Sequence, residues 1–176
     1  MAPARTPLSV CAQAAGKWVV GIDWVCDSRA AGKWLEPDPR THVVLGDMHQ
    51  SGGVLRSRER AAAGGRPILD GHCFVVCANA DAVLSQADTE KLARMCGGRV
   101  LNAKEKAKAR GTDFEGAPLH VLVPTPLTVA SVRAARARYG AEAELLTSSW
   151  LLDCISAYKL LPTAAYSADG AGAAEA

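Results

Sequence analysis

One segment of the sequence recurs at an offset of 126 residues, and this internal repeat constrains the fold more than any other feature. The first copy reads VVGIDWVCDS over residues 19–28, and the second reads LLTSSWLLDC over residues 145–154. An apolar pair, a tryptophan, an aspartate and a small residue coincide in the two copies. Internal repeats indicate that one supersecondary unit occurs more than once. Each copy is predicted to be a strand that leads into a helix.

Each predicted helix carries a tryptophan and, four positions later, a small residue: Trp24 with Ser28, and Trp150 with Cys154. Positions four apart lie on one face of a helix. A small side chain lets the helix approach a sheet closely, while the indole fills the space beside it. We therefore predict that both tryptophans are structural core residues without a catalytic role.

Strands and helices are predicted to alternate along the chain between residue 67 and the end of the second copy. Short apolar runs bounded by Gly, Pro or Asn indicate strands, and apolar residues spaced i, i+3, i+4 after a capping residue indicate helices. The expected strands are 73–77, 99–101, 119–123 and 144–146, and the expected helices run from Ser85 or Asp88 to Cys96 before Gly97 and Gly98, over 129–139 and over 150–158. This alternation predicts an α/β fold with a central, parallel four-stranded sheet flanked by helices.

Three other segments show weaker signals of regular structure. Residues 41–66 contain two Gly-Gly pairs and no sustained apolar period, which predicts a linker. Residues 104–116 are predicted to be a charged loop. Residues 164–176 are mostly Ala, Gly and Ser, which predicts a disordered tail.

Composition and missing motifs exclude several classes of function. A net charge of +2 over 176 residues is too small for a strongly basic nucleic-acid-binding protein. The sequence contains no run of 18 apolar residues, which is the length needed to cross a membrane. The sequence has no glycine-rich nucleotide loop and no nucleophile elbow, so we expect neither an enzyme, a cofactor nor a small-molecule substrate.

His72 and His120 adjoin predicted strands and are interpreted as packed or surface residues. The six cysteines include one close pair, Cys73 and Cys77, whereas a structural zinc site needs two, so we expect reduced thiols and no metal.

The apolar strand, the Gly-Gly pair after the first helix and the Trp-x-x-x-Cys/Ser pattern of the last helix resemble the BRCT domain. The resemblance covers a complete repeat over residues 67–163, whereas residues 1–40 resemble only the C-terminal half of a repeat. A first repeat would then lack its first strand, first helix and second strand, so we expect residues 1–176 alone to be marginally stable or to aggregate. More finely, residues 15–20 (AGKWVV) resemble the first BRCT repeat of the breast-cancer-susceptibility protein, and residues 148–154 resemble the last repeat of its RING-domain partner.

This resemblance implies a nuclear protein-interaction module of a DNA-damage-response scaffold, whose partners are phosphorylated or chromatin-associated repair proteins. Any ubiquitin-ligase activity would belong to a RING domain outside this chain. BRCT phosphate pockets take a hydroxyl and a backbone N–H from the end of the first strand and a lysine from the second helix. Arg5 and Thr6 match the helix motif of the first repeat, but the lysine position is Leu8. The equivalent places in the second repeat, Ala78-Asn79 and 125–127, also lack lysine, so neither phosphate pocket is complete.

An alternative reading is a phosphate-independent BRCT module that contacts DNA or nucleosomes through basic segments. Phosphate contacts of that kind need clustered Lys and Arg. The candidates are two basic runs: Arg56, Arg58 and Arg60, and Lys104, Lys106, Lys108 and Arg110. A third reading is a structural remnant with neither binding activity.

Overall fold

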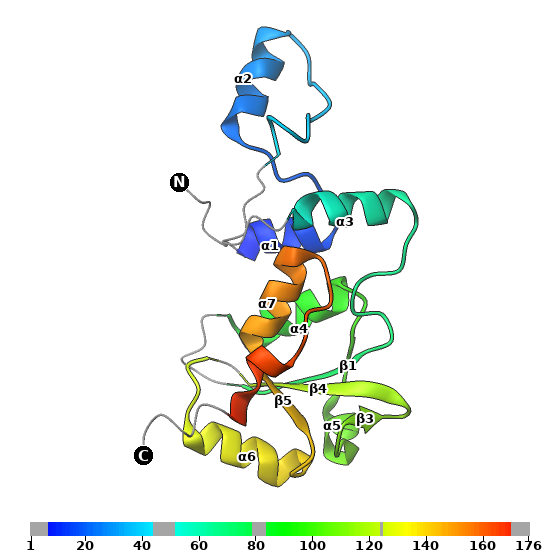
Figure 1. Ribbon diagram of the computed structural model, residues 1–176, viewed down its shortest axis with the longest axis vertical. Helices are drawn as coiled ribbons and strands as arrows, with labels where there is room; N and C mark the ends of the chain where they lie inside the picture. Colours follow the sequence, from blue (N-terminus) through cyan, green and yellow to red (C-terminus); the bar gives the residue numbers. More distant parts are fainter. Residues whose placement is uncertain (1–6, 44–51, 79–83, 124, 170–176) are drawn as a thin grey trace. The chain divides into compact units, whose positions relative to one another are not determined.

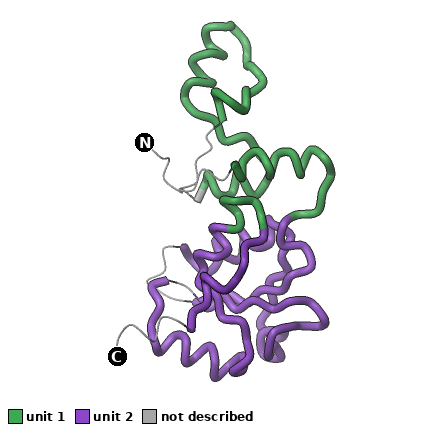
Figure 2. The backbone as a smooth tube through the Cα atoms, in the orientation of Figure 1, with its two compact units in different colours: residues 1–67, 154–159 green, residues 68–153, 160–176 purple. Residues whose placement is uncertain are grey.

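A computed structural model of the chain describes residues 7–43, 52–78, 84–123 and 125–169. The chain divides into two compact units (Figure 2), of which unit 1 contains residues 1–67 and 154–159 and unit 2 contains residues 68–153 and 160–176. Within the part of the chain that the structure describes, no helix has both the length and the apolar character needed to cross a membrane.

Unit 2 is built on a parallel sheet with the strand order β2-β1-β4-β5 (Figure 1). The strands are β1 (Cys73–Val76), β2 (Arg99–Val100), β4 (Ala117–Val123) and β5 (Glu144–Thr147). The predicted four-stranded parallel sheet is therefore confirmed. A fifth, two-residue strand, β3 (Asp113–Phe114), pairs antiparallel with the start of β4.

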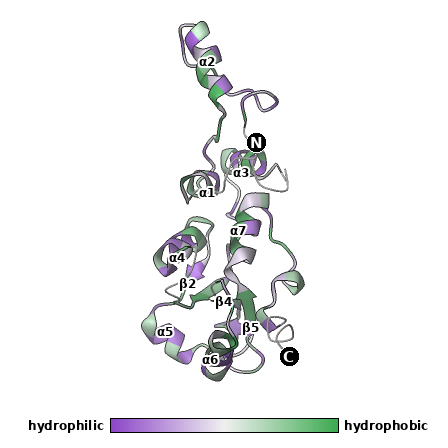
Figure 3. Cartoon of the chain, turned by 90° about the vertical axis from the view of Figure 1, so that its left-hand side faces the viewer, coloured by the Kyte–Doolittle hydropathy of each residue, from purple (hydrophilic) through white to green (hydrophobic). Residues whose placement is uncertain are grey.

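Helices cover both faces of this sheet. Helix α4 (Gln86–Met95) and the start of α7 (Ser148–Ala157) lie on one side, and α5 (Ala103–Lys108) and α6 (Val129–Tyr139) lie on the other, as Figures 1 and 3 show. The Ser85 hydroxyl caps α4 by accepting the Asp88 amide, which agrees with the predicted start. At the other end, a Cβ on Gly98 would lie 2.5 Å from the Phe74 ring, so the close approach of helix and strand requires glycine there.

The interior of the sheet is made of apolar residues that are almost completely removed from solvent. The sheet accordingly forms a hydrophobic layer between more polar helix surfaces (Figure 3). The largest fully buried side chains of unit 2 include Phe74, Leu119, Leu122 and Leu145 of the strands and Trp150 of α7. Successive side chains of a strand point to opposite faces of the sheet. Because helices cover both faces here, the side chains on both faces are apolar, which explains why the strand sequences are continuously hydrophobic.

Part of the predicted charged loop 104–116 is regular structure. Residues 103–108 form α5, whose Asn102 side chain accepts the Lys104 and Glu105 amides while the Glu105 carboxylate accepts the Asn102 amide. This reciprocal capping box stabilises a helix that buries no residue of its own. The loop prediction was wrong here because a six-residue helix without an apolar face leaves no periodic signal.

The predicted disordered tail is ordered over its first six residues. A 3-10 helix, η1 (Ala164–Tyr166), places the Tyr166 hydroxyl 2.9 Å from the Asp153 carboxylate, and Arg136 forms an ion pair with Asp169. Ala168 is completely buried. These contacts join distant segments, so composition alone could not show them. Residues 170–176 lie outside the described residues.

Unit 1 contains α1 (Pro7–Ala14), α2 (Ile22–Ala30), α3 (Gly53–Ala62) and the end of α7. Helix α3 lies within the predicted linker 41–66, so the expectation of an irregular segment was wrong over residues 53–62. Its buried face consists of Gly53, Val54 and Ser57, which is too polar to read as an apolar period. The Ser57 hydroxyl donates to the Gln13 carbonyl oxygen, which ties α3 to α1.

The last carbonyl groups of α7 are satisfied within unit 1. The Gln13 side-chain amide donates to the Ile155 and Ser156 carbonyl oxygens, at 2.7 Å each, and Arg56 Nε donates to the Ala157 carbonyl oxygen at 2.8 Å. Helix ends leave such carbonyls without intrahelical partners. Side chains from α1 and α3 therefore complete the C-terminus of α7.

The two copies of the internal repeat form matching hydrogen bonds at the tryptophan and at the end of the helix. The Trp24 indole N–H donates to the Leu35 carbonyl oxygen at 2.8 Å, and the Trp150 indole N–H donates to that of Leu161 at 3.0 Å. Both partners lie 11 residues after the tryptophan. The helix ends also match, because Lys33 N–H bonds to Ser28 O as Lys159 N–H bonds to Cys154 O. The two copies thus share one local structure, a capped helix with a returning chain.

The two copies differ in their surroundings. Residues 19–20 do not form the predicted strand, since Val20 makes only an isolated antiparallel bridge to Val43. Trp150 is fully buried, whereas Trp24 is half-buried and stacks on Trp34 with ring centroids 5.0 Å apart. The first copy therefore has the local fold of the second without a sheet beside it among the described residues.

Candidate functional site: a hollow at the carboxyl end of β1

The connections of the sheet place a switch point between β1 and β4. From β1 the chain passes through α4 to β2 on one side, and from β4 it passes through α6 to β5 on the other. In open parallel sheets, ligands bind beyond the carboxyl ends of the strands at such a point. A cavity of about 340 Å³ lies there, and we call it the β1 hollow. Its lining residues are Val76, Cys77, Ala78, Gln86, Lys106, Ser131, Ala134, Ala135, Arg138 and Tyr139.

Lys106 is the first of two cations on the β1 hollow, and it is already paired. Its Nζ atom lies 3.2 Å from Glu90 Oε1, which also accepts the Gln86 side-chain amide at 2.8 Å. Arg94 holds the other oxygen of Glu90 at 3.0 Å. Burial alone would raise the pKa of Glu90, but these three hydrogen bonds together lower it. The carboxylate stays ionised and neutralises Lys106.

Arg138 is the second cation, and it faces the β1 hollow from α6 together with Ser131. Its guanidinium lies 5.7 Å from the centroid of the Tyr139 ring and forms no ion pair with a carboxylate among the described residues. Ser131 and Arg138 are seven positions apart, two turns along one helix face. Arg138 was not predicted from the sequence, although its spacing from Ser131 is visible there. The β1 hollow therefore offers an anionic group the guanidinium of Arg138, whereas the Ser131 hydroxyl already donates to the Thr128 carbonyl oxygen at 2.8 Å.

Cys77 does not make the β1 hollow a catalytic centre. Burial raises the pKa of its thiol more than nearby Lys106 and Arg138 lower it. The thiol is therefore protonated near neutral pH, and the thiol form is a poor nucleophile and metal ligand. Within residues 7–43, 52–78, 84–123 and 125–169, no three His, Cys, Asp or Glu side chains gather closely enough to hold a metal ion.

The residues predicted from the BRCT phosphate pocket lie only partly within the described structure. Arg5 and Thr6 fall outside the described residues, as does Asn79. Ala78 lines the β1 hollow, where it contributes no hydroxyl. The predicted core positions Ser28, Gly98, Trp150 and Cys154 are buried, and Gly97 is half-buried.

The two predicted basic runs belong to different units, and most of their charges have partners. Arg56 bonds to a helix end, as described above, and Arg58 lies 5.1 Å from the centroid of the Trp18 ring. Arg60 Nε donates to the Arg66 carbonyl oxygen, and Arg110 donates to the Ala109 carbonyl oxygen at 2.7 Å. With Lys106 paired to Glu90, the ammonium groups of Lys104 and Lys108 are the members of the two runs that are exposed and have no hydrogen-bond partner among the described residues.

A chain of two histidines and a carboxylate lies beside Trp150 in unit 2. His120 Nδ1 is 2.6 Å from Glu144 Oε2, and His120 Nε2 is 2.9 Å from His72 Nδ1. Because an ionised carboxylate only accepts, His120 carries its proton on Nδ1 and accepts the His72 Nδ1–H through Nε2. The His120 ring also packs 4.9 Å from Trp150. Both imidazoles are therefore neutral, packed side chains, and their packing agrees with the sequence interpretation.

The neutral histidine pair predicts a loss of stability in acid. Burial lowers the pKa of His72 and of His120 more than Glu144 raises them. Below pH of about 6.5 the unfolded chain therefore binds more protons than the folded chain. Stability is complete above that pH and falls as the pH drops toward the lower folded-state values, by at most about 1.4 kcal/mol per pH unit for each histidine.

Urea unfolding at about pH 7.5 and about pH 5 measures this loss. The His72→Gln/His120→Gln double variant is the matched control, because glutamine keeps hydrogen-bonding capacity and cannot titrate. We expect the double variant to lose most of the difference between the two pH values. A wild-type chain that is equally stable or more stable in acid would contradict the assignment.

Comparison with solved structures identifies the fold as that of BRCT domains. The BRCT5-BRCT6 domains of Brc1 from S. pombe superimpose with a TM-score of 0.53 and 16% sequence identity, over 90% of this chain and 76% of that one. Rtt107p residues 820–1070 superimpose with a TM-score of 0.53 and 12% identity, over 93% and 70% of the two chains. A structure of Rtt107p with phosphorylated histone H2A gives a TM-score of 0.54 at 12% identity, with the same coverage. No protein-family model matches the chain, and no curated protein matches its sequence.

Proposed function

We propose that this chain is a BRCT-type protein-interaction module that binds phosphorylated segments of DNA-repair or chromatin proteins. The observation that carries the proposal is Arg138, which lines the β1 hollow at the switch point of a BRCT fold and pairs with no carboxylate among the described residues. A guanidinium donates charge-assisted hydrogen bonds to a phosphate group. The likeness to a structure of Rtt107p with a phosphorylated histone supports this ligand class.

The β1 hollow is suited to binding and lacks the groups for catalysis. Its cysteine is protonated, and the carboxylate of Glu90, which pairs with Lys106, is held ionised by three donors. A general acid or base needs a pKa near the working pH, which neither group has. We therefore propose a module without enzymatic activity.

The expected affinity is modest because, among the described residues, the phosphate site has one unneutralised cation. A hydrogen bond to a charged group contributes about 1.5–3 kcal/mol. The lysine that BRCT pockets take from the second helix is absent from residues 125–127, and Lys106 is committed to Glu90. Arg138 would thus supply most of the discrimination between a phosphorylated and an unphosphorylated peptide.

Replacing Arg138 with alanine tests the site. We expect the Arg138→Ala variant to bind members of a phosphoserine peptide library about 10- to 100-fold more weakly, as loss of one charge-assisted contact predicts. Fluorescence polarisation with phosphorylated and dephosphorylated versions of each selected peptide measures the difference. Arg133→Ala is the matched control, because Arg133 is an exposed arginine of the same helix and does not line the β1 hollow.

Two results would contradict this assignment. Equal binding of phosphorylated and unphosphorylated peptides would remove phosphate recognition. Equal weakening by Arg133→Ala and Arg138→Ala would show that only the overall charge of α6 matters.

The alternative function, contact with DNA or nucleosomes through the basic runs, predicts that the logarithm of the binding constant falls steeply with the logarithm of the salt concentration. The engagement of Arg56, Arg58 and Arg60 within unit 1 does not favour it.

The finer assignment, to the nuclear scaffold of a ubiquitin-ligase heterodimer, rests on residues 15–20 and 148–154. Residues 15–20 lead into α2, and residues 148–154 form the main part of α7. A pull-down from nuclear extract, probed for RING-domain proteins, would test that assignment separately from phosphate binding. A structural remnant without partners predicts no binding in either experiment.

A further inference from the structure

The two cations of the β1 hollow come from different elements and act on the same place. Lys106 belongs to α5 and Arg138 to α6, and both line the hollow. Both positive charges lower the pKa of the Cys77 thiol, against the larger effect of burial, so both lie near the carboxyl end of β1. A phosphoserine carries about 1.5–2 negative charges at pH 7, so two cations at one place suit it better than one.

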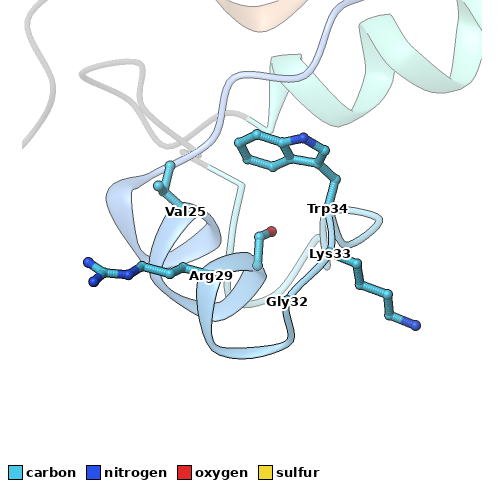
Figure 4. A pocket seen from close by; sticks show the side chains of 6 residues that line it. Val25, Arg29, Gly32, Lys33 and Trp34 are labelled. Atoms are coloured by element: carbon cyan, nitrogen blue, oxygen red, sulfur yellow. The ribbon is translucent and has the colours of Figure 1, made fainter.

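Another hollow of the chain has two cations that do not converge. It lies in unit 1, has a volume of about 380 Å³, and has Arg29 and Lys33 among its lining residues. Figure 4 shows the side chains of Arg29 and Lys33 pointing away from each other and away from the hollow. Two lining cations therefore do not by themselves make a phosphate site, and Lys33 offers a matched control for Lys106.

Lys106 is paired with a carboxylate that lies outside the β1 hollow. Its Nζ atom is 3.2 Å from Glu90 Oε1, and Glu90 is not among the lining residues of the hollow. The side chains of Lys106 and Glu90 are only 16% and 17% exposed, so salt screens this ion pair less than it screens a surface pair. A phosphate group that enters the hollow therefore competes with Glu90 for Lys106.

Glu90 keeps two other donors if Lys106 leaves it. Gln86 donates to the same oxygen at 2.8 Å, and Arg94 donates to the other oxygen at 3.0 Å. Breaking a buried ion pair is strongly unfavourable when it leaves an uncompensated charge. Here Arg94 still neutralises the carboxylate, so the release of Lys106 costs less. The lysine side chain is a flexible four-carbon stem with a compact charge, which permits it to change partners.

We propose that Glu90 regulates the β1 hollow by competing for Lys106, which transfers to a dianionic phosphate ester in the hollow but stays on Glu90 when the ligand is a carboxylate. This inference rests on the proposed function, in which Arg138 binds the phosphate. A carboxylate ligand carries the same single charge as Glu90 and gives Lys106 no electrostatic advantage, whereas a phosphate ester carries nearly twice that charge. The competition therefore favours phosphoserine over aspartate or glutamate at the same position of a peptide.

Glu90→Gln is the first test of this competition. Glutamine keeps the shape and an acceptor oxygen but has no charge, so it holds Lys106 less strongly. We expect the variant to bind a phosphoserine peptide, selected from the library with the wild-type chain, about fivefold or more tightly in fluorescence polarisation. The glutamate version of that peptide is expected to gain at least as much, so that the preference for phosphoserine falls. Unchanged or weaker binding of the phosphoserine peptide would overturn the proposal.

Lys106→Met separates competition for Lys106 from a general loss of negative charge. Alone, it is expected to weaken binding of the phosphoserine peptide about threefold, because the contact with phosphate is partly offset by the lost contact with Glu90. Lys33→Met removes a lysine from the hollow of unit 1 and is expected to leave the affinity unchanged. In the Lys106→Met background, Glu90→Gln should change the affinity by less than about twofold. An equal gain from Glu90→Gln with and without Lys106 would show that Lys106 does not transfer.

Arg138→Ala in the same assay distinguishes failure of this inference from failure of the proposed function. We expect phosphoserine binding to depend on Arg138 and the effects of Glu90 and Lys106 to be coupled. If binding depends on Arg138 while Glu90→Gln and Lys106→Met act additively, the phosphate site is correct and the competition is not. If no phosphoserine peptide binds more tightly than its dephosphorylated form, the proposed function and this inference are both wrong.

Discussion

Replacing Trp150 with alanine is expected to lower the free energy of unfolding of unit 2 by about 3–5 kcal/mol. The indole is fully buried against the Phe74 and His120 rings, and its N–H bonds to the Leu161 carbonyl oxygen. Alanine removes the buried ring, leaves a cavity and removes the indole hydrogen bond to that carbonyl. Urea unfolding followed by far-UV circular dichroism measures the loss without depending on the tryptophan signal.

The internal repeat provides a matched control for this experiment. Trp24→Ala removes the same residue from the same helix position and breaks the equivalent hydrogen bond to Leu35. Because Trp24 is only half-buried, we expect a loss of less than about 2 kcal/mol. Equal losses of unfolding free energy in the two variants would show that packing of Trp150 against the sheet contributes nothing to stability.

Gly53→Ala is expected to destabilise unit 1 by about 3 kcal/mol, at the upper end of the range for overpacking. A Cβ at this first residue of α3 would lie 1.8 Å from the Ser156 carbonyl oxygen and 2.4 Å from Gln13 Nε2. The obstacle is the backbone at the end of α7, so α3 must move away. That movement would also weaken the bonds from Gln13 and Arg56 that satisfy the end of α7. Hydrogen exchange of the α3 amides, with urea unfolding, measures the effect.

Gly64→Ala isolates the steric part of this prediction. Gly64 follows the other end of α3 with a φ of 64°, and no atom lies within 4 Å of an added Cβ. Alanine there should cost only about 1 kcal/mol, the usual penalty for a left-handed conformation. If Gly64→Ala were as damaging as Gly53→Ala, the close approach of α3 to Ser156 would not be the cause.

The regular elements that local sequence specifies were predictable. Helix α6 begins at the Thr128 cap and ends before Gly140, as expected, and β1 and β4 follow continuous apolar runs. Helices α3 and α5 were missed because neither has an apolar period. Helix α5 is stabilised by its capping box, and α3 is stabilised by contacts with α1 and α7, which no local pattern reports.

The candidate site was predictable only in part. The family resemblance pointed to the end of the first strand, and Ala78 lines the β1 hollow that lies there. Arg138 was missed because it follows that strand by about 60 residues and reaches the β1 hollow only through the connections between the strands of the sheet. Lys106 was assigned to an exposed basic run, and only the tertiary structure shows that Glu90 neutralises it.

The two copies of the repeat separate what the sequence by itself determined from what the tertiary structure decided. Local sequence determined the helix, its C-terminal turn and the indole hydrogen bond 11 residues onward, since all three depend on residues within one short segment. The tertiary structure decided that Trp150 is buried and Trp24 half-exposed. Burial depends on which distant residues lie over a side chain, and for Trp150 these are supplied by β1 and β4.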